Sequence, residues 1–79
     1  MINNTIELSF FAISRDIYGP KLQLSNIENL DSLLKKLSEI SNNELIFSFR
    51  FAVDQKFINN QYIFRDGDKI SVIPPSSGG

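Results

Sequence analysis

Only one segment of this chain has the periodicity of a helix, and that restricts the folds that the rest can form. Its apolar residues recur at helical spacing in one stripe: Ile27, Leu30, Leu33, Leu34, Leu37 and Ile40. Asn26 precedes the stripe and can accept a hydrogen bond from a free N–H group of the first turn, and we expect the helix to run to about Ser41. The chain has 79 residues, enough for one small domain. A single helix in such a domain has to cover one face of the sheet that the other segments form.

The other apolar segments are short, and they alternate between apolar and polar residues as half-buried strands do. The alternation covers residues 5–10, 21–24, 47–53 and 69–73. Gly19 and Pro20 predict that residues 12–20 form a loop, which makes the first two strands a hairpin. Asp66-Gly67-Asp68 predicts a tight turn before the last strand. This order predicts an α+β domain of the β-grasp type, in which a mixed sheet is covered on one face by a single main helix.

Phenylalanines recur at every second position from Phe47 through Phe49 to Phe51, and this pattern assigns them to the buried face of a strand. Alternating aromatic side chains can also stack on nucleic-acid bases. Arg50 is the only basic residue between them, however, and the net charge of −1 lacks the positive excess that phosphate binding requires. We therefore expect core packing at these positions and no nucleic-acid partner.

The sequence contains no cysteine and no histidine. That removes the usual thiol nucleophile, the proton shuttle of neutral pH and nearly every zinc ligand set. Asp66 and Asp68 lack the further ligands of a calcium loop. We therefore expect no metal, no bound cofactor and no autonomous enzymatic activity. Because the apolar runs are too short to span a membrane and the first residues lack the form of a signal peptide, the expected location is the cytoplasm, without a membrane partner.

The end of the sequence joins stiff residues to small ones. Two prolines stop the last strand, and four small residues follow them: Pro74, Pro75, Ser76, Ser77, Gly78 and Gly79. Small residues bury little surface, so we expect a domain of residues 1–75 and a flexible tail of residues 76–79. One interpretation of the tail is a frayed end without a role. The other is a thin probe that enters a narrow channel on another protein, since glycine has no side chain to obstruct entry.

A terminal carboxylate at Gly79 is a poor electrophile until a partner converts it to a mixed anhydride, as adenylation by ATP does. The activated carbonyl can then take sulfur and become a thiocarboxylate, or it can be joined to an amine as an amide. Neither reaction needs a catalytic side chain from the carrier itself. The tail interpretation therefore agrees with the missing cysteine and histidine.

Four further side chains are candidates for contacts with such a partner: Phe11, Arg15, Phe57 and Ile73. Phe11 and Ile73 fall on the polar faces of their strands, so either they form an exposed contact patch or an irregularity turns them inward. Phe57 follows a turn, and it either contacts the partner or seals the end of the core. Arg15 either pairs with Asp16 in solvent or binds a carboxylate or carbonyl group of the partner.

Three stretches of the chain resemble the small, sulfur-carrying subunit of molybdopterin synthase: residues 8–16, 51–58 and 66–79. Two features differ from the family, namely Asp54, where Asn is more frequent, and the phenylalanine-rich stretch 45–51. The resemblance implies that a ubiquitin-activating-like enzyme uses ATP to adenylate Gly79 and that a sulfur donor then converts it to a thiocarboxylate. It also implies that the large catalytic subunit receives the tail in a heterotetramer, where sulfur is delivered to a cyclic pyranopterin phosphate.

The resemblance further implies roles for residues at matching positions. The tail residues next to Gly79 would lie in the partner's channel: Pro75, Ser76, Ser77 and Gly78. Phe11, Phe57 and Ile73 match apolar positions that contact the partner, and Arg15 matches an arginine near the interface. Two alternatives stay open. One is a related carrier for thiazole (thiamine) synthesis or tRNA thiolation, and the other is a ubiquitin-like protein modifier whose glycines end in an isopeptide bond.

Overall fold

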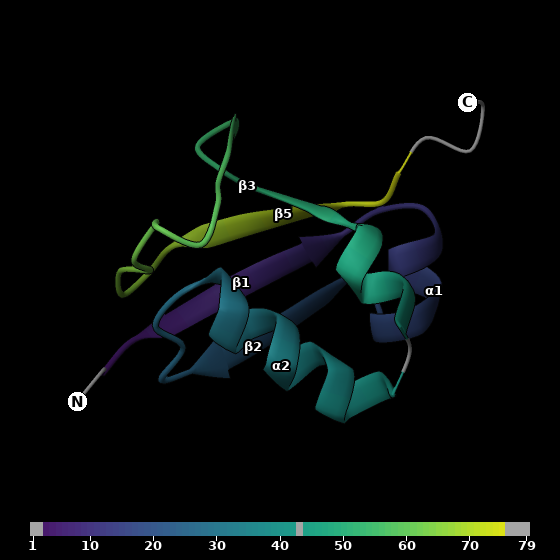
Figure 1. The fold of residues 1–79 in the computed structure, drawn as a ribbon, viewed down its shortest axis with the longest axis horizontal. Helices are drawn as coiled ribbons and strands as arrows, with labels where there is room; N and C mark the ends of the chain where they lie inside the picture. Colours follow the sequence, from purple (N-terminus) through teal and green to yellow (C-terminus); the bar gives the residue numbers. More distant parts are fainter. Residues whose placement is uncertain (1–2, 43, 76–79) are drawn as a thin grey trace.

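A five-stranded mixed sheet with strand order β2-β1-β5-β3-β4 organises the molecule (Figure 1). The computed structural model describes residues 3–42 and 44–75. Along the chain, the elements are β1 (Thr5–Phe10), α1 (Ile13–Tyr18), β2 (Lys21–Ser25), α2 (Leu30–Ser41), the 3₁₀ helix η1 (Glu44–Ser48), β3 (Arg50–Val53), β4 (Lys56–Phe57) and β5 (Lys69–Ile73). The predicted β-grasp fold, with one main helix over a mixed sheet, is confirmed.

The last strand lies in the middle of the sheet. β5 runs parallel to β1, with Phe10 opposite Val72, and antiparallel to β3, with Arg50 opposite Ile73. The end of β1 and the beginning of β3 therefore flank the point where β5 ends. Figure 1 shows the chain leaving the sheet at that end.

The core lies between the sheet and α2. Leu33 and Leu37 of the helix have no exposed surface, and they belong to one cluster with the inward-facing strand residues Ile6, Leu8, Ile70 and Val72. Burial of each such side chain contributes about 1.5–3 kcal/mol. The alternation that predicted β1 and β5 is confirmed, because the buried residues of both strands recur at every second position.

The main helix begins later than predicted. Its N-cap is Asn29, whose side-chain oxygen accepts a hydrogen bond from the N–H group of Ser32 at 3.1 Å. Asn26 does not cap the helix but adopts a positive φ of 63°. Ile27 belongs to the core but lies outside the helix, so the apolar stripe extends beyond the helical residues. The predicted end near Ser41 is confirmed.

A buried asparagine explains this late start. The Asn4 side chain accepts a hydrogen bond from the Ile27 N–H group at 3.0 Å and donates to the carbonyl groups of Ile27 at 2.7 Å and Phe64 at 3.3 Å. Since backbone polar groups in the interior need partners, Asn4 substitutes for a helical or strand bond around Ile27. It joins three distant segments of the chain.

The prediction of a loop over residues 12–20 is wrong in part, because α1 occupies most of it. Tyr18 fixes this short helix. Its ring stacks on Phe10 with centroids 5.0 Å apart, and its hydroxyl donates to the Leu37 carbonyl at 3.2 Å. Packing against β1 and α2, which a local pattern of polar residues does not reveal, therefore stabilises the helix.

The prediction of a strand from Phe47 is also wrong at its beginning. η1 replaces the first residues of that strand, and Phe47 is 60% exposed instead of belonging to the core. Ile46 takes the buried position instead. A 3₁₀ helix rotates successive side chains by a third of a turn, so the alternation of inward and outward side chains in a strand does not apply here. Phe49 and Phe51 are buried as predicted.

We predict that Asn4→Ala lowers the free energy of unfolding by about 2–3 kcal/mol, because the buried backbone groups of Ile27 and Phe64 lose their partners. Urea denaturation would measure the change. Asn3→Ala is the matched control. Asn3 is the neighbouring asparagine and is exposed, so its substitution should change the free energy of unfolding by less than about 0.5 kcal/mol. Equal effects of the two substitutions would contradict this role of Asn4.

Candidate functional site

The candidate site is the end of the sheet where β5 stops. Ile73 is its last residue, Pro74 is half-buried, and Pro75 is exposed. Pro75 is also the last described residue. The tail residues that the sequence singles out lie outside the described residues, so their roles and the domain boundary remain predictions: Ser76, Ser77, Gly78 and Gly79.

Phe11 directly follows β1, and its side chain is 52% exposed. The buried Ser14 holds its backbone from both sides. The Ser14 hydroxyl donates to the Phe11 carbonyl at 2.6 Å and accepts a hydrogen bond from the Phe11 N–H group at 3.1 Å. Phe11 is therefore exposed and not turned inward, and its backbone is held by the two hydrogen bonds to Ser14.

The neighbouring residue has an unfavourable backbone conformation. Ala12 has φ 53° and ψ −132°. Glycine adopts this conformation readily, whereas a residue with a Cβ atom is sterically strained in it. Such a conformation costs on the order of 1 kcal/mol and persists where the surroundings enforce it. Here the bond from the Arg15 N–H group to the Ala12 carbonyl, at 3.0 Å, closes the turn that leads into α1.

Phe57 reaches the outer face of the sheet through a tight hairpin. Asp54 and Gln55 both have positive φ, 53° and 67°, as a two-residue type I′ turn requires. The turn sets Phe57 opposite Ala52 and leaves its ring 60% exposed, so Phe57 does not seal the core. The guanidinium carbon of Arg50 lies 5.3 Å from the ring centroid, within cation–π range.

Ile73 lies beside this pair. It is opposite Arg50 in the sheet register, and directly opposed residues share a face. Phe51 and Val72, the next opposed pair, are buried on the other face. Ile73 itself is half-buried, so it is neither fully exposed nor turned into the core. The outer face near the exit of β5 thus combines apolar surface with one cation.

Arg15 lies on α1 and is exposed. Within residues 3–42 and 44–75 the single ion pair joins Lys21 and Glu7 at 3.9 Å, so Arg15 does not pair with Asp16. Its guanidinium is therefore open to an external acceptor. Contact of Arg15, Phe11, Phe57 and Ile73 with a partner stays a prediction.

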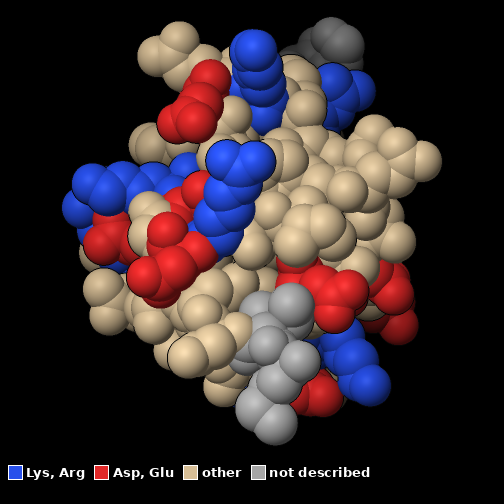
Figure 2. Space-filling view, turned by 90° about the vertical axis from the view of Figure 1, so that its left-hand side faces the viewer, with Lys and Arg blue, Asp and Glu red and all other residues tan. Residues whose placement is uncertain are grey.

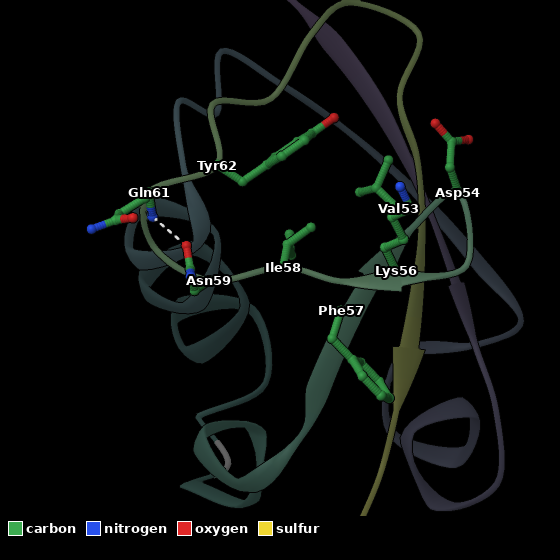
Figure 3. A pocket seen from close by; sticks show the side chains of 8 residues that line it. All are labelled: Val53, Asp54, Lys56, Phe57, Ile58, Asn59, Gln61 and Tyr62. Atoms are coloured by element: carbon green, nitrogen blue, oxygen red, sulfur yellow. Dashed lines mark hydrogen bonds between the residues drawn. The ribbon is translucent and has the colours of Figure 1, made fainter.

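A cavity of about 470 Å³ lies beside the β3–β4 hairpin, and no sequence pattern predicts it (Figure 3). Its lining consists of Val53, Asp54, Lys56, Phe57, Ile58, Asn59, Gln61 and Tyr62. The Tyr62 hydroxyl donates to Asp68 at 2.9 Å, and partial burial together with this bond raises the pKa of Tyr62. The phenol therefore stays protonated at neutral pH and acts as a structural donor.

The rest of the described surface offers little further chemistry. No group of three or more metal-ligating side chains occurs in residues 3–42 and 44–75. None of the helices in that part of the chain has the length and apolar character needed to cross a bilayer. Figure 2 shows basic and acidic side chains intermingled on one end of the molecule, without a patch of one sign. The predicted cytoplasmic location stays a prediction.

Comparison with known proteins identifies the family. A sequence model of the ThiS family matches residues 8–79, from within β1 to the last glycine. The chain belongs to the ThiS family. A comparison with curated proteins finds no match.

Solved structures share the β-grasp fold of this ThiS-family chain. One chain in a complex of subunits 1 and 2 of molybdopterin-converting factor from Helicobacter pylori is 27% identical, with TM-score 0.71 over 95% of this chain and 99% of that one. Small archaeal modifier protein 1 from Methanosarcina acetivorans is 23% identical, with TM-score 0.74 over 98% of each chain. The same modifier from Haloferax volcanii is 17% identical, with TM-score 0.75 over 96% of this chain and all of that one. By family and fold the chain is a ubiquitin-like sulfur carrier.

Sequence reasoning missed three exposed apolar side chains of the ThiS-family chain near this site: Ile13, Leu45 and Phe47. The loop predicted over residues 12–20 includes Ile13, and the strand predicted from Phe47 places that side chain in the core. The signal for Phe47 was the apolar Ile46 beside it, because two adjacent apolar residues cannot both point inward in a strand.

We predict that Ala12→Gly raises the free energy of unfolding by about 1 kcal/mol, because glycine removes the strain at positive φ. Thermal and urea unfolding would measure it. Ala52→Gly in β3 is the control and should lower stability by about 1 kcal/mol, since it loosens a strand without relieving strain. If Ala12→Gly destabilises the chain as much as Ala52→Gly does, the assigned strain at Ala12 is absent.

Proposed function

We propose that this chain is the sulfur-carrier small subunit of molybdopterin synthase, acting in molybdenum cofactor biosynthesis. The observation that supports this proposal best is that a ThiS-family chain has exposed apolar surface near the end of β5. Phe11, Phe57 and Ile73 are near the end of β5, from which the Gly-Gly tail continues. A partner that holds Gly79 has to meet this surface, because Gly79 is only four residues from Pro75.

The proposed chemistry takes place at the carboxylate of Gly79 and needs no other group of the carrier. A carboxylate oxygen attacks the α-phosphate of ATP on the activating enzyme, and pyrophosphate leaves. A sulfide-level donor then attacks the acyl-adenylate carbonyl, and AMP leaves with the electron pair, so that a thiocarboxylate remains. This sequence involves no net oxidation or reduction. The thiocarboxylate sulfur then bonds to a carbon of a cyclic pyranopterin phosphate on the large subunit and displaces an oxygen leaving group from that carbon. Water then cleaves the acyl–sulfur bond, so that the sulfur stays on the pterin and Gly79 returns to a carboxylate.

The proposed chemistry requires two partner proteins, one for activation of Gly79 and one for sulfur transfer. The activating enzyme is a ubiquitin-activating-like adenylating protein, and the catalytic partner is the large subunit of molybdopterin synthase in a heterotetramer. Support comes from the Helicobacter pylori neighbour, which was solved as a complex of subunits 1 and 2 of molybdopterin-converting factor. The exposed Arg15 is suited to a carbonyl or carboxylate acceptor on that partner.

A second function is favoured by a specific observation. Two neighbours of similar fold are small archaeal modifier proteins. A modifier uses the same activated carbonyl of Gly79, but a lysine amine of a target protein attacks it in place of sulfur, and an isopeptide bond forms. The two functions thus share activation and differ in the nucleophile.

We predict that incubation of the chain with ATP, the activating enzyme and sulfide increases its intact mass by one sulfur-for-oxygen exchange. Deletion of Gly79 should abolish the exchange, because the adenylated carbonyl is then misplaced by one residue in the activating site. Intact-mass spectrometry measures both. Asn3→Ala is the control and should undergo the same mass increase as the unchanged protein, since Asn3 is exposed and lies before β1.

Thiocarboxylated chain mixed with the large subunit should then convert a cyclic pyranopterin phosphate to its dithiolene product, detected by chromatography. Absence of the sulfur exchange in the intact chain would contradict the carrier role. Sulfur exchange without product, together with lysine-linked conjugates of the chain in cell extracts, would favour the modifier over the synthase subunit.

A further inference from the structure

The exit of β5 has a second apolar flank that no family resemblance assigns. On the β1 side lies Phe11, and on the β3 side lies η1. η1 ends at Ser48, two residues before Arg50, and Arg50 is opposite Ile73. Opposed strand residues have Cα atoms about 4.5–5.5 Å apart. Figures 1 and 3 both place η1 at the end of the sheet where β5 ends.

η1 presents its apolar side chains to solvent in a fixed arrangement. Phe47 is 60% exposed and Leu45 is 48% exposed, while Ile46 between them is completely buried. The Ser48 hydroxyl donates to the Leu45 carbonyl at 2.7 Å, and the Phe49 N–H group donates to the Ile46 carbonyl at 3.2 Å. The anchor at Ile46 and these two bonds hold η1 in place. We call the surface of Leu45 and Phe47 the η1 patch.

The short separation of Gly79 from Pro75 decides what covers this patch. Gly79 is four residues beyond Pro75, so at most roughly 14 Å of extended chain separates the two. A protein that holds Gly79 inside a channel therefore has its channel entrance against the end of the domain. Phe47 is three residues from Arg50, or at most about 11 Å along the chain, so it lies within the footprint of such an entrance.

We propose that the η1 patch is a contact surface for the large, tail-accepting subunit of molybdopterin synthase. The inference rests on the proposed function and extends the contact area from the outer face of the sheet to the β3 flank of the exit. The residues from Leu45 to Phe49 carry no charge, so the part of the channel entrance that meets them is apolar. Phe47 is the anchor of the η1 patch, because a large aromatic side chain buries more apolar surface in a contact than Leu45 does.

The test compares Phe47→Ser with Ile63→Ser. Ile63 is 50% exposed and pairs with Asn29 at the start of α2. Its neighbour Phe64 is bound to Asn4 just before β1, so Ile63 lies at the opposite end of the sheet from the exit. Both substitutions remove an exposed apolar side chain, and only Phe47→Ser removes one from the proposed interface.

The dissociation constant of each chain for the purified large subunit is measured by calorimetry. Phe47→Ser should weaken binding about tenfold or more, and Ile63→Ser should leave it within about twofold of the unchanged protein. Phe47→Ala is measured in parallel, and thermal unfolding of all variants checks that their domains are folded. A folded Phe47 variant that binds as tightly as the unchanged protein overturns the proposal.

Two further outcomes separate this inference from its premise. If the unchanged chain does not bind the large subunit at all, the proposed function fails. If sedimentation shows that the unchanged chain alone is a dimer and that Phe47→Ser converts it to a monomer, the η1 patch is an interface between two copies, and the inference is overturned while the proposed function stands.

Discussion

The pairing of β5 with its two neighbours is the constraint on which the rest of the structure depends. Because β1 runs parallel to β5 and β3 runs antiparallel to it, the end of one strand and the beginning of another meet where the chain leaves the sheet. A shift of one residue would exchange the buried Ile70 and Val72 for Ser71 and Ile73, and would be opposed by the loss of core burial. The core thus fixes what surrounds the exit.

The candidate site follows from this arrangement more than from any reactive group. Phe11, held by Ser14, and Phe57, set by the type I′ turn, are exposed by backbone geometry in places where alternation alone left the outcome open. Strain at Ala12 is part of the same geometry, since the turn that leads into α1 requires a positive φ. In the function proposed above, partners perform the reactions, and the carrier has to present an end of the domain that they recognise.

Much of this was accessible from the sequence, and the exceptions have physical reasons. Alternation and helical spacing are properties of single elements, so β1, β5 and the extent of α2 to Ser41 could be predicted. Asn29 replaced Asn26 as the cap because Asn4, a residue distant in sequence, binds the backbone of Ile27. Phe47 was misplaced because a 3₁₀ helix preserves an apolar composition while changing which side chain is buried. Contacts between distant segments decide such cases.

The central claim is that a tail-accepting partner covers the end of the domain around the exit of β5. Its most direct test is an NMR titration of the ¹⁵N-labelled chain with the unlabelled large subunit. The account predicts that the amide signals of Phe11, Phe47 and Ile73 shift or broaden first, together with those of their neighbours. Perturbations confined to the exposed face of α2, around Lys35 and Glu39, with the signals at the exit unchanged, would contradict it.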